Sequence, residues 1–255
     1  MTDIQAVLEA LIPVVRAAGD LIMEVYARDF TVRGKDDASP VTEADERAEE
    51  LIVPALAGIL PVVPVVAEEA VAAGRVPEVE DRFWLVDPLD GTKEFIHRNG
   101  EFTVNVALVE GGEPLLGVVL APALGRLYGG ARGVGAFVED VDGRRPIRVR
   151  EVPADGLTVV ASRSHGDADA LARFLDGRRV ARTRSAGSSL KLCLVASGDA
   201  DVYPRLGRTM EWDIAAGHAV LAAAGGRVTT IDGLPLRYGK PGFDNPHFVA
   251  WGTGD

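Results

Sequence analysis

The sequence has one cysteine, four histidines and no uninterrupted run of 18 or more apolar residues among its 255 positions. A single cysteine excludes a disulfide within the chain and fits a reducing compartment. Cys193 lies in the apolar run 192–195, where we expect a buried and unreactive thiol. Because the chain also lacks a basic, cleavable N-terminal segment, we expect a cytoplasmic protein without stable membrane insertion.

Positive charge is scarce as well. The 27 lysines and arginines are outnumbered by 38 aspartates and glutamates, which gives a net charge of −11. This balance argues against general binding to nucleic acid or to a membrane surface. An anionic substrate would be repelled at long range, so holding one requires local cations from a metal ion or from arginine. The remaining composition, 47% hydrophobic and 25% charged, is typical of a globular protein with one large domain or two smaller ones that share a core.

Hydrophobic periodicity predicts two amphipathic helices near the N-terminus, at 4–27 and at about 43–60. Thr42 is the expected N-cap of the second helix, with Asp45 at the capping-box position three residues later. Asp45 also falls at the edge of the apolar stripe, where a carboxylate needs a partner because unpaired burial is costly. Strands are expected at 30–34, 62–67 and 83–86, followed by an antiparallel meander of four runs at 102–109, 115–121, 126–130 and 135–138, and by a polar loop at 139–145.

Strands and helices alternate after a domain boundary that we place near Val152-Pro153. Strands are predicted at 157–161, 178–184, 200–204 and 226–230, and helices at about 167–175, 189–197 and 212–224. Such alternation favours a layered α/β half. We therefore expect an α/β protein with an α+β half at 1–152, an α/β half at 153–255 and the active site in the cleft between them.

The most informative segment is the run Asp87-Pro88-Leu89-Asp90-Gly91-Thr92, which follows an apolar strand. Pro88 stiffens the turn, and Gly91 lets the backbone approach a ligand closely. The two carboxylates suit a hard divalent cation, and the amides of Gly91 and Thr92 suit a phosphate if a helix starts there. An Asp-x-x-Asp pair also occurs in solvated turns and helix caps, so the neighbouring motifs decide between these interpretations.

Further acidic residues occupy the ends of predicted elements: Glu68-Glu69 after an apolar run, Asp213 at a helix start, and Asp45. Each alone has an ordinary explanation as a solvated pair, a helix-dipole partner or a cap. Together, and in this order, they resemble the inositol monophosphatase superfamily of magnesium-dependent, lithium-sensitive phosphomonoesterases. The resemblance covers essentially the whole chain. Its motifs are the run at 87–92 and Trp212-Asp213-Ile214-Ala215-Ala216-Gly217, supported by the stretch 35–45 and by Glu68-Glu69.

The resemblance implies a layered αβαβα architecture of the sugar-phosphatase type and two or three Mg²⁺ ions per active site. It implies that Glu68, Asp87 and the carbonyl of Leu89 hold one ion, and that Asp87, Asp90 and Asp213 hold a second. Thr92 and Asp45 would orient and deprotonate the attacking water, and the hydroxyl of Thr92 could be the partner that Asp45 needs. Ions bridged by Asp87 can clamp both nucleophile and ester oxygen of an in-line displacement.

Within the superfamily, the run 87–96 looks like the 3′(2′),5′-bisphosphate nucleotidases of CysQ type, as do Ser162-Arg163-Ser164-His165, Gly187-Ser188-Ser189-Leu190-Lys191 and Tyr203-Pro204-Arg205. The resemblance implies that these segments bind substrate, together with the 87–92 turn, through Gly91, Thr92, His165, Ser188, Lys191, Arg205 and Asp213. Arginine at 205 suits a second phosphate, because a guanidinium is always charged and can bind two oxygens. A surface role for Arg205 and a solvated one for Lys191 are the alternatives.

The expected reaction is hydrolysis of the 3′-phosphate of 3′-phosphoadenosine 5′-phosphate to AMP and phosphate, which recycles a by-product of sulfur metabolism. An inositol-phosphate or fructose-1,6-bisphosphate phosphatase is the enzymatic alternative, since these branches share the metal ligands. A non-catalytic binding relative is the alternative of another class, and the intact ligand set speaks against it. The sequence leaves open whether the chain forms a homodimer.

Overall fold

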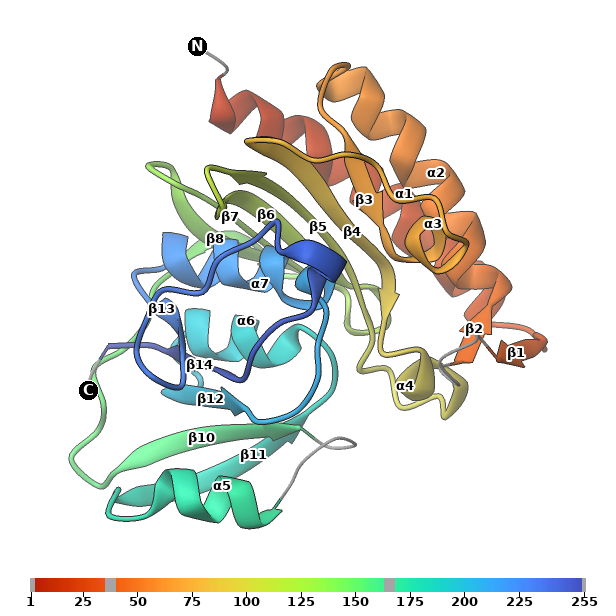
Figure 1. Ribbon diagram of the computed structural model, residues 1–255. Helices are drawn as coiled ribbons and strands as arrows, with labels where there is room; N and C mark the ends of the chain where they lie inside the picture. The colour runs from red at the N-terminus through yellow and green to blue at the C-terminus, as the bar shows by residue number, and fades with distance from the viewer. Residues whose placement is uncertain (1–2, 35–39, 163–167, 254–255) are drawn as a thin grey trace.

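Two main β-sheets, each flanked by helices, make up most of the molecule (Figure 1). The computed structural model describes residues 3–34, 40–162 and 168–253. Helices α1 (Ile4–Tyr26) and α2 (Glu43–Ile59) cover the outer face of the first sheet, and α6 (Leu190–Ala196) and α7 (Glu211–Ala223) lie between the sheets. Helix α5 (Ala168–Leu175) covers the outer face of the second sheet. This order of layers confirms the predicted αβαβα architecture.

The first sheet has seven strands in the order β3-β4-β5-β6-β7-β8-β9. Strand β3 (Val65–Ala67) runs parallel to β4 (Arg82–Asp90). The predicted antiparallel meander is formed by β5 (Thr103–Glu110), β6 (Glu113–Ala121), β7 (Arg126–Ala131) and β8 (Gly135–Asp140), and β9 (Gly143–Ile147) adds a fifth strand to it. A short 3₁₀ turn, Pro122–Leu124, links β6 to β7. Strand β9 corrects the loop predicted at 139–145, because an edge strand whose residues are mostly exposed has the polar composition of a loop.

The second sheet has five strands in the order β11-β10-β12-β14-β13. Strands β10 (Leu157–Ser162), β11 (Val180–Ala186) and β12 (Val202–Arg205) are parallel, while β14 (Phe248–Trp251) is antiparallel to both β12 and β13 (Arg227–Thr230). Strand β14 was not predicted. The two sheets lie on either side of residue 152, but the division into domains at that point stays a prediction.

The N-terminal helices follow the predicted pattern. Helix α1 buries one apolar stripe, and α2 starts at the Thr42 cap with the expected capping box to Asp45. Strand β1 (Val32–Gly34) lies within the strand predicted at 30–34, whereas its partner β2 (Pro40–Thr42) and the short helix α3 (Glu68–Ala72) were not predicted. Among the described helices, none combines the length and apolar character needed to cross a bilayer.

Helix α7 lies directly on the first sheet because glycines open the space for it. A Cβ atom at Gly117 would be 2.5 Å from the carbonyl oxygen of Ala216, and one at Gly130 would be 2.8 Å from the Cα of Val220. Contacts this short exclude any side chain at these positions without movement of the helix. Helix α7 also packs on β4, the strand that ends at Asp90, so the close approach fixes the helix relative to the 87–92 turn.

Candidate active site

A cleft of about 1210 Å³ opens between the two halves of the molecule. Its walls come from segments far apart in the sequence: α2, α3, the end of β4, the turn before α6, the end of β12 and the start of α7. Six of the residues predicted for the site line this cleft: Glu68, Asp90, Ser188, Lys191, Arg205 and Asp213. Predicted residues that are distant in sequence therefore share one cavity.

The 87–92 turn, at the end of β4, belongs to the first half of the chain and reaches the cleft at Asp90. The pairing of β4 with β5 is regular up to Asp87 and is interrupted between Asp87 and Asp90, where Pro88 has no N–H to donate. The N–H of Leu89 instead donates to Oδ1 of Asp87 over 3.0 Å. Gly91 has a φ of +91°, which favours glycine, and helix α4 (Thr92–Ile96) begins immediately after it.

Asp45 and Thr92 are in direct contact, as expected. The Thr92 hydroxyl donates to Oδ1 of Asp45 over 3.1 Å and lies 3.3 Å from the carbonyl oxygen of Leu89. Oδ2 of Asp45 accepts from the N–H and the hydroxyl of Thr42 at 2.8 and 2.7 Å. Asp45 is only 2% exposed, so these bonds satisfy a carboxylate that would otherwise be costly to bury.

The acidic residues of the cleft strongly affect one another's pKa. Burial, followed by the charges of Glu68, Asp90 and Asp213, raises the pKa of Asp87 well above its ordinary value of 3.8. The pKa of Asp213 is raised in the same way, by burial and by the charges of Asp90 and Glu68. Burial raises the pKa of Asp90 to about 6 although Lys191 opposes the change. A group of carboxylates that repel one another in a buried place is stabilised by a cation.

The donor chemistry of this group fits magnesium, since all of its side-chain donors are carboxylate oxygens and the carbonyl of Leu89 adds another. Within the described residues, no three histidine, cysteine, aspartate or glutamate side chains are grouped closely enough to hold a metal ion as they stand. The assignment of individual metal ligands therefore stays a prediction that rests on the electrostatics and on the resemblance.

Two cations, Lys191 and Arg205, also line the cleft, and we call them its cationic wall. Lys191 is only 5% exposed, and burial lowers its pKa to about 8 even though the charge of Asp90 opposes this. Its Nζ donates to the carbonyl oxygen of Ser188 over 2.5 Å. Arg205 donates from Nη2 to the carbonyl oxygen of Arg208 over 2.7 Å, while its buried Nε has no hydrogen-bond partner among the described residues. A buried donor of this kind needs an acceptor, and a phosphate oxygen would supply one.

The turn at 187–189 is fastened to the first half by residues that the sequence analysis did not select. Glu101 accepts the N–H of Gly187 over 2.8 Å, and the Thr103 hydroxyl lies 3.0 Å from that of Ser188. The Thr103 hydroxyl also lies 3.0 Å from Oδ1 of Asn105, whose Nδ2 reaches Oδ2 of Asp90 at 3.4 Å. Polar residues at alternate positions of an otherwise apolar strand were the signal available for Thr103 and Asn105.

All the predicted site residues except His165 are therefore located at the cleft or at the 87–92 turn beside it. Asp45, Asp87, Leu89, Gly91 and Thr92 belong to the 87–92 turn or contact it. His165 lies outside the described residues, as does the segment 35–39 that supported the resemblance.

Comparison with known proteins agrees with this geometry. The model of the inositol monophosphatase family matches residues 3–250. The 3′(2′),5′-bisphosphate nucleotidase CysQ of Escherichia coli strain K12 is 49% identical over 244 residues, which is 94% of this chain and 98% of that protein. The protein of the same name from Buchnera aphidicola is 39% identical and covers 95% of this chain and 92% of its own length.

Solved structures give the same result. CysQ from Bacteroides thetaiotaomicron, described as a bacterial member of the inositol monophosphatase family, superposes with a TM-score of 0.82 at 38% identity over 98% of both chains. The Thermotoga maritima IMPase superposes with a TM-score of 0.78 at 32% identity, over 94% of this chain and 89% of that one. The family match spans nearly the whole sequence, and the chain belongs to the inositol monophosphatase family.

Proposed function

We propose that the protein is a Mg²⁺-dependent phosphomonoesterase that hydrolyses the 3′-phosphate of 3′-phosphoadenosine 5′-phosphate to give AMP and phosphate. The observation that carries the proposal is that one cleft is lined both by a carboxylate wall, Asp90 and Asp213 with Asp87 buried beside them, and by the cationic wall of Lys191 and Arg205. A bisphosphate presents two anionic groups to such a cleft. The relatives that match over nearly their full length are named 3′(2′),5′-bisphosphate nucleotidases, which supports this choice of substrate.

Glu68, Asp87 and the carbonyl of Leu89 would hold one Mg²⁺, and Asp87, Asp90 and Asp213 a second; a third ion is compatible with the family resemblance. When bound, magnesium neutralises charge on the phosphoryl oxygens and lowers the pKa of a coordinated water. Binding of the cation is favoured because it removes the charge repulsion among these buried carboxylates.

Asp45 and Thr92 act on the attacking water. Thr92 donates its proton to Oδ1 of Asp45, which leaves lone pairs on the Thr92 hydroxyl oxygen to accept a proton from water. The two Thr42 contacts hold Asp45 in this orientation. As the water oxygen bonds to phosphorus and the bond to the 3′ oxygen breaks, the water proton passes through Thr92 to Asp45, and the 3′ oxygen takes its proton from solvent.

Substrate recognition falls to the cationic wall and the adjoining turns. Arg205 and Lys191 bind the 5′-phosphate. The Nε of Arg205, which has no partner among the described residues, donates a hydrogen bond to it. Gly91, Thr92 and Ser188 contact the rest of the substrate, together with Asp213 and His165. This arrangement discriminates by charge, since a buried cation left without its phosphate is unfavourable.

The same carboxylate wall would serve an inositol monophosphatase or a fructose-1,6-bisphosphate phosphatase, and the Thermotoga maritima IMPase is similar enough to keep the first alternative open. A buried cationic wall is not needed for a substrate with one phosphate. We also propose inhibition by lithium, since a small monovalent cation fits oxygen ligands but neutralises less charge. A cytoplasmic location is in keeping with the free, buried Cys193. The question of a homodimer stays open.

Phosphate release from a panel of substrates tests the proposal. The panel contains 3′-phosphoadenosine 5′-phosphate, inositol 1-phosphate and fructose 1,6-bisphosphate, each assayed with magnesium and with EDTA. We expect the highest kcat/KM for the bisphosphate nucleotide, complete loss in EDTA, and loss by several orders of magnitude in Asp87→Asn. A higher kcat/KM for either of the other substrates would assign the protein to another branch of the family.

A further inference from the structure

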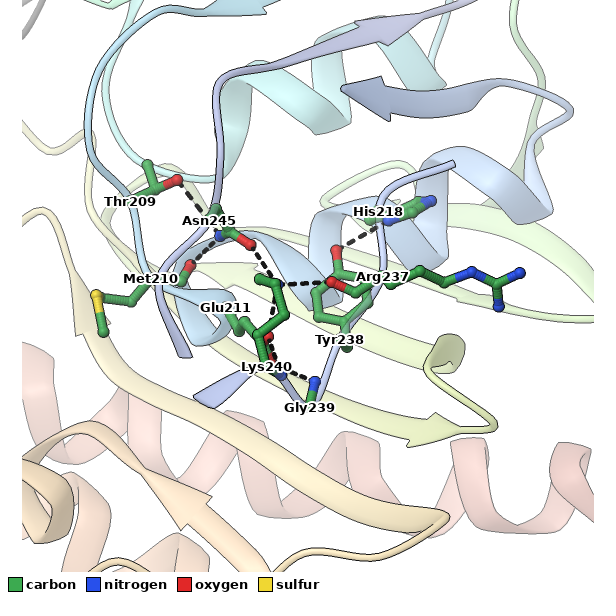
Figure 2. Close-up of polar contacts among 9 residues, drawn as sticks. All are labelled: Thr209, Met210, Glu211, His218, Arg237, Tyr238, Gly239, Lys240 and Asn245. Atoms are coloured by element: carbon green, nitrogen blue, oxygen red, sulfur yellow. Dashed lines mark hydrogen bonds and ion pairs between the residues drawn. The ribbon is translucent and has the colours of Figure 1, made fainter. Parts of the chain in front are cut away.

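A polar network joins the start of helix α7 to the C-terminal segment 237–245 (Figure 2). Its centre is Glu211, whose side chain is 0% exposed and which stands two residues before Asp213. Glu211 accepts hydrogen bonds from the backbone N–H groups of Gly239 and Lys240 at 2.7 and 2.9 Å. It also accepts one from Nζ of Lys240 at 2.5 Å. Both oxygens of this buried carboxylate therefore accept hydrogen bonds from one segment of the chain.

Lys240 and Asn245 extend the network to the backbone that precedes α7. Nζ of Lys240 donates to the carbonyl oxygen of Arg237 at 2.6 Å and to Oδ1 of Asn245 at 3.2 Å. Asn245 is 8% exposed, and its Nδ2 donates to the carbonyl oxygen of Met210 at 2.7 Å and to the Thr209 hydroxyl at 3.4 Å (Figure 2). The backbone N–H of Asn245 donates to the carbonyl oxygen of Thr209 at 2.9 Å.

This network ends at the carboxylate of Asp213. Met210 is the N-cap residue of α7, and its N–H donates to Oδ2 of Asp213 over 2.8 Å. Met210 is thus held on one side by Asn245, through its carbonyl, and supports Asp213 on the other, through its N–H. Farther along the helix, His218 Nδ1 lies 2.9 Å from the hydroxyl of Tyr238, which fixes the same C-terminal segment to the middle of α7.

We propose that Glu211, Lys240 and Asn245 are positioning residues for Asp213, and that they set the affinity of the site for its divalent cation. The inference rests on the proposed function, in which Asp213 is a magnesium ligand. A buried ion pair adds little net stability, because desolvation offsets much of the attraction. The Glu211–Lys240 ion pair does fix the positions of its neighbours, and here these are the residues immediately before Asp213. Partners that orient a metal ligand from behind typically contribute about 10- to 100-fold to metal affinity.

The chain contains a matched control for this ion pair. Arg150 pairs with Asp201, whose side chain is likewise 0% exposed and also accepts from a backbone N–H, that of Thr158. Neither member of the Arg150–Asp201 pair lines the cleft. Lys240→Met and Arg150→Met therefore each remove the cation from a fully buried carboxylate, one beside the site and one away from it.

The experiment measures Mn²⁺ binding in the absence of substrate, from the loss of the free-ion signal in electron paramagnetic resonance, and the Mg²⁺ concentration for half-maximal phosphate release. We expect Lys240→Met to raise the Mn²⁺ Kd and the half-saturating Mg²⁺ concentration by about tenfold or more, with kcat at saturating magnesium within a few-fold of wild type. Lys240→Arg keeps the cation and should restore most of the affinity. Arg150→Met should lower Tm without changing either metal constant.

Unchanged metal constants in Lys240→Met, or equal changes in Lys240→Met and Arg150→Met, would overturn the inference. If Lys240→Met does not fold, Asn245→Ala gives the same test without leaving an unpaired charge, and it should also raise both constants. The wild-type protein separates this inference from the proposed function. Absence of Mn²⁺ binding and of magnesium-dependent turnover in wild type would refute the proposed function itself.

Discussion

Asp90→Asn should make the metal-free protein more stable, although it removes a predicted magnesium ligand. In the folded protein the pKa of Asp90 is raised from 3.8 to about 6, chiefly by burial, so its ionised form is disfavoured there. At 1.36 kcal/mol per pKa unit, this difference corresponds to about 3 kcal/mol above pH 6. Asparagine has the same shape and no charge. The full gain is an upper bound, since Lys191 loses the attraction of Asp90.

The sign of the pH dependence follows from the direction of the shift. Because the folded state holds the Asp90 proton more tightly than the unfolded state, wild-type stability falls as pH rises from about 4 to about 6. The variant lacks this titration, so the two proteins should be similar in stability near pH 4 and differ most above pH 6. For a chain of this length, about 3 kcal/mol corresponds to roughly 6–12 °C in Tm.

Urea and thermal unfolding in EDTA, at pH values between 4.5 and 8, measure this difference. Magnesium at 100 times its Kd should remove most of this difference, because an ion at that concentration adds about 2.7 kcal/mol to a protein that binds it, and Asp90→Asn should have lost much of that binding. The reasoning is refuted if Asp90→Asn is less stable than wild type in EDTA at pH 8, or if the difference between them does not change with pH.

Three further predictions concern the substrate, the water and the turn. Arg205→Ala should lower kcat/KM for 3′-phosphoadenosine 5′-phosphate by roughly 30- to 3,000-fold, that is about 2–5 kcal/mol, and barely affect 3′-AMP; equal losses would make Arg205 structural. Thr92→Val and Asp45→Asn should each lower kcat by roughly 10²–10⁴, with the double variant little worse than either; strictly additive losses would mean separate roles. Thr103→Val should lower the free energy of unfolding in urea by about 1–3 kcal/mol, since it removes a fully buried hydroxyl from two contacts; an unchanged value would show that neither matters.

The contact between Asp45 and Thr92 shows what local sequence could predict. The capping position of Thr42 fixed the start of α2, and helical periodicity then placed Asp45 at the edge of a buried stripe. A buried carboxylate needs a partner, and the 87–92 motif offered the Thr92 hydroxyl. The first two steps used residues within one turn of a helix, where spacing determines direction, whereas the pairing with Thr92, 47 positions away, came with the family resemblance.

Lys191 shows where this reasoning stops. A lysine in an apolar helix had a solvated role as its alternative, yet Lys191 is almost fully buried. Helix α6 lies between the two sheets, so both of its sides are covered (Figure 1). Periodicity reports which face of a helix is apolar, not how many layers surround it.

The missed elements have a similar cause. Strand β14 pairs with β12 and β13, for example Ala250 with Tyr203, and it lies beyond the alternation of strands and helices on which the prediction for this half rested. The bond between Glu211 and Lys240 joins positions 29 apart, with most of helix α7 and strand β13 between them, and neither residue has a local sequence signal. Contacts of this kind come from topology, which becomes visible only when the layers are assembled.

The central claim is that magnesium-dependent hydrolysis removes the 3′-phosphate while the cationic wall holds the 5′-phosphate. The direct test is to identify the products of 3′-phosphoadenosine 5′-phosphate by ³¹P nuclear magnetic resonance, with magnesium and with EDTA. We predict inorganic phosphate and 5′-AMP in equal amounts with magnesium, and unchanged substrate in EDTA. Release of the 5′-phosphate to leave 3′-AMP, or hydrolysis that continues in EDTA, would contradict the account.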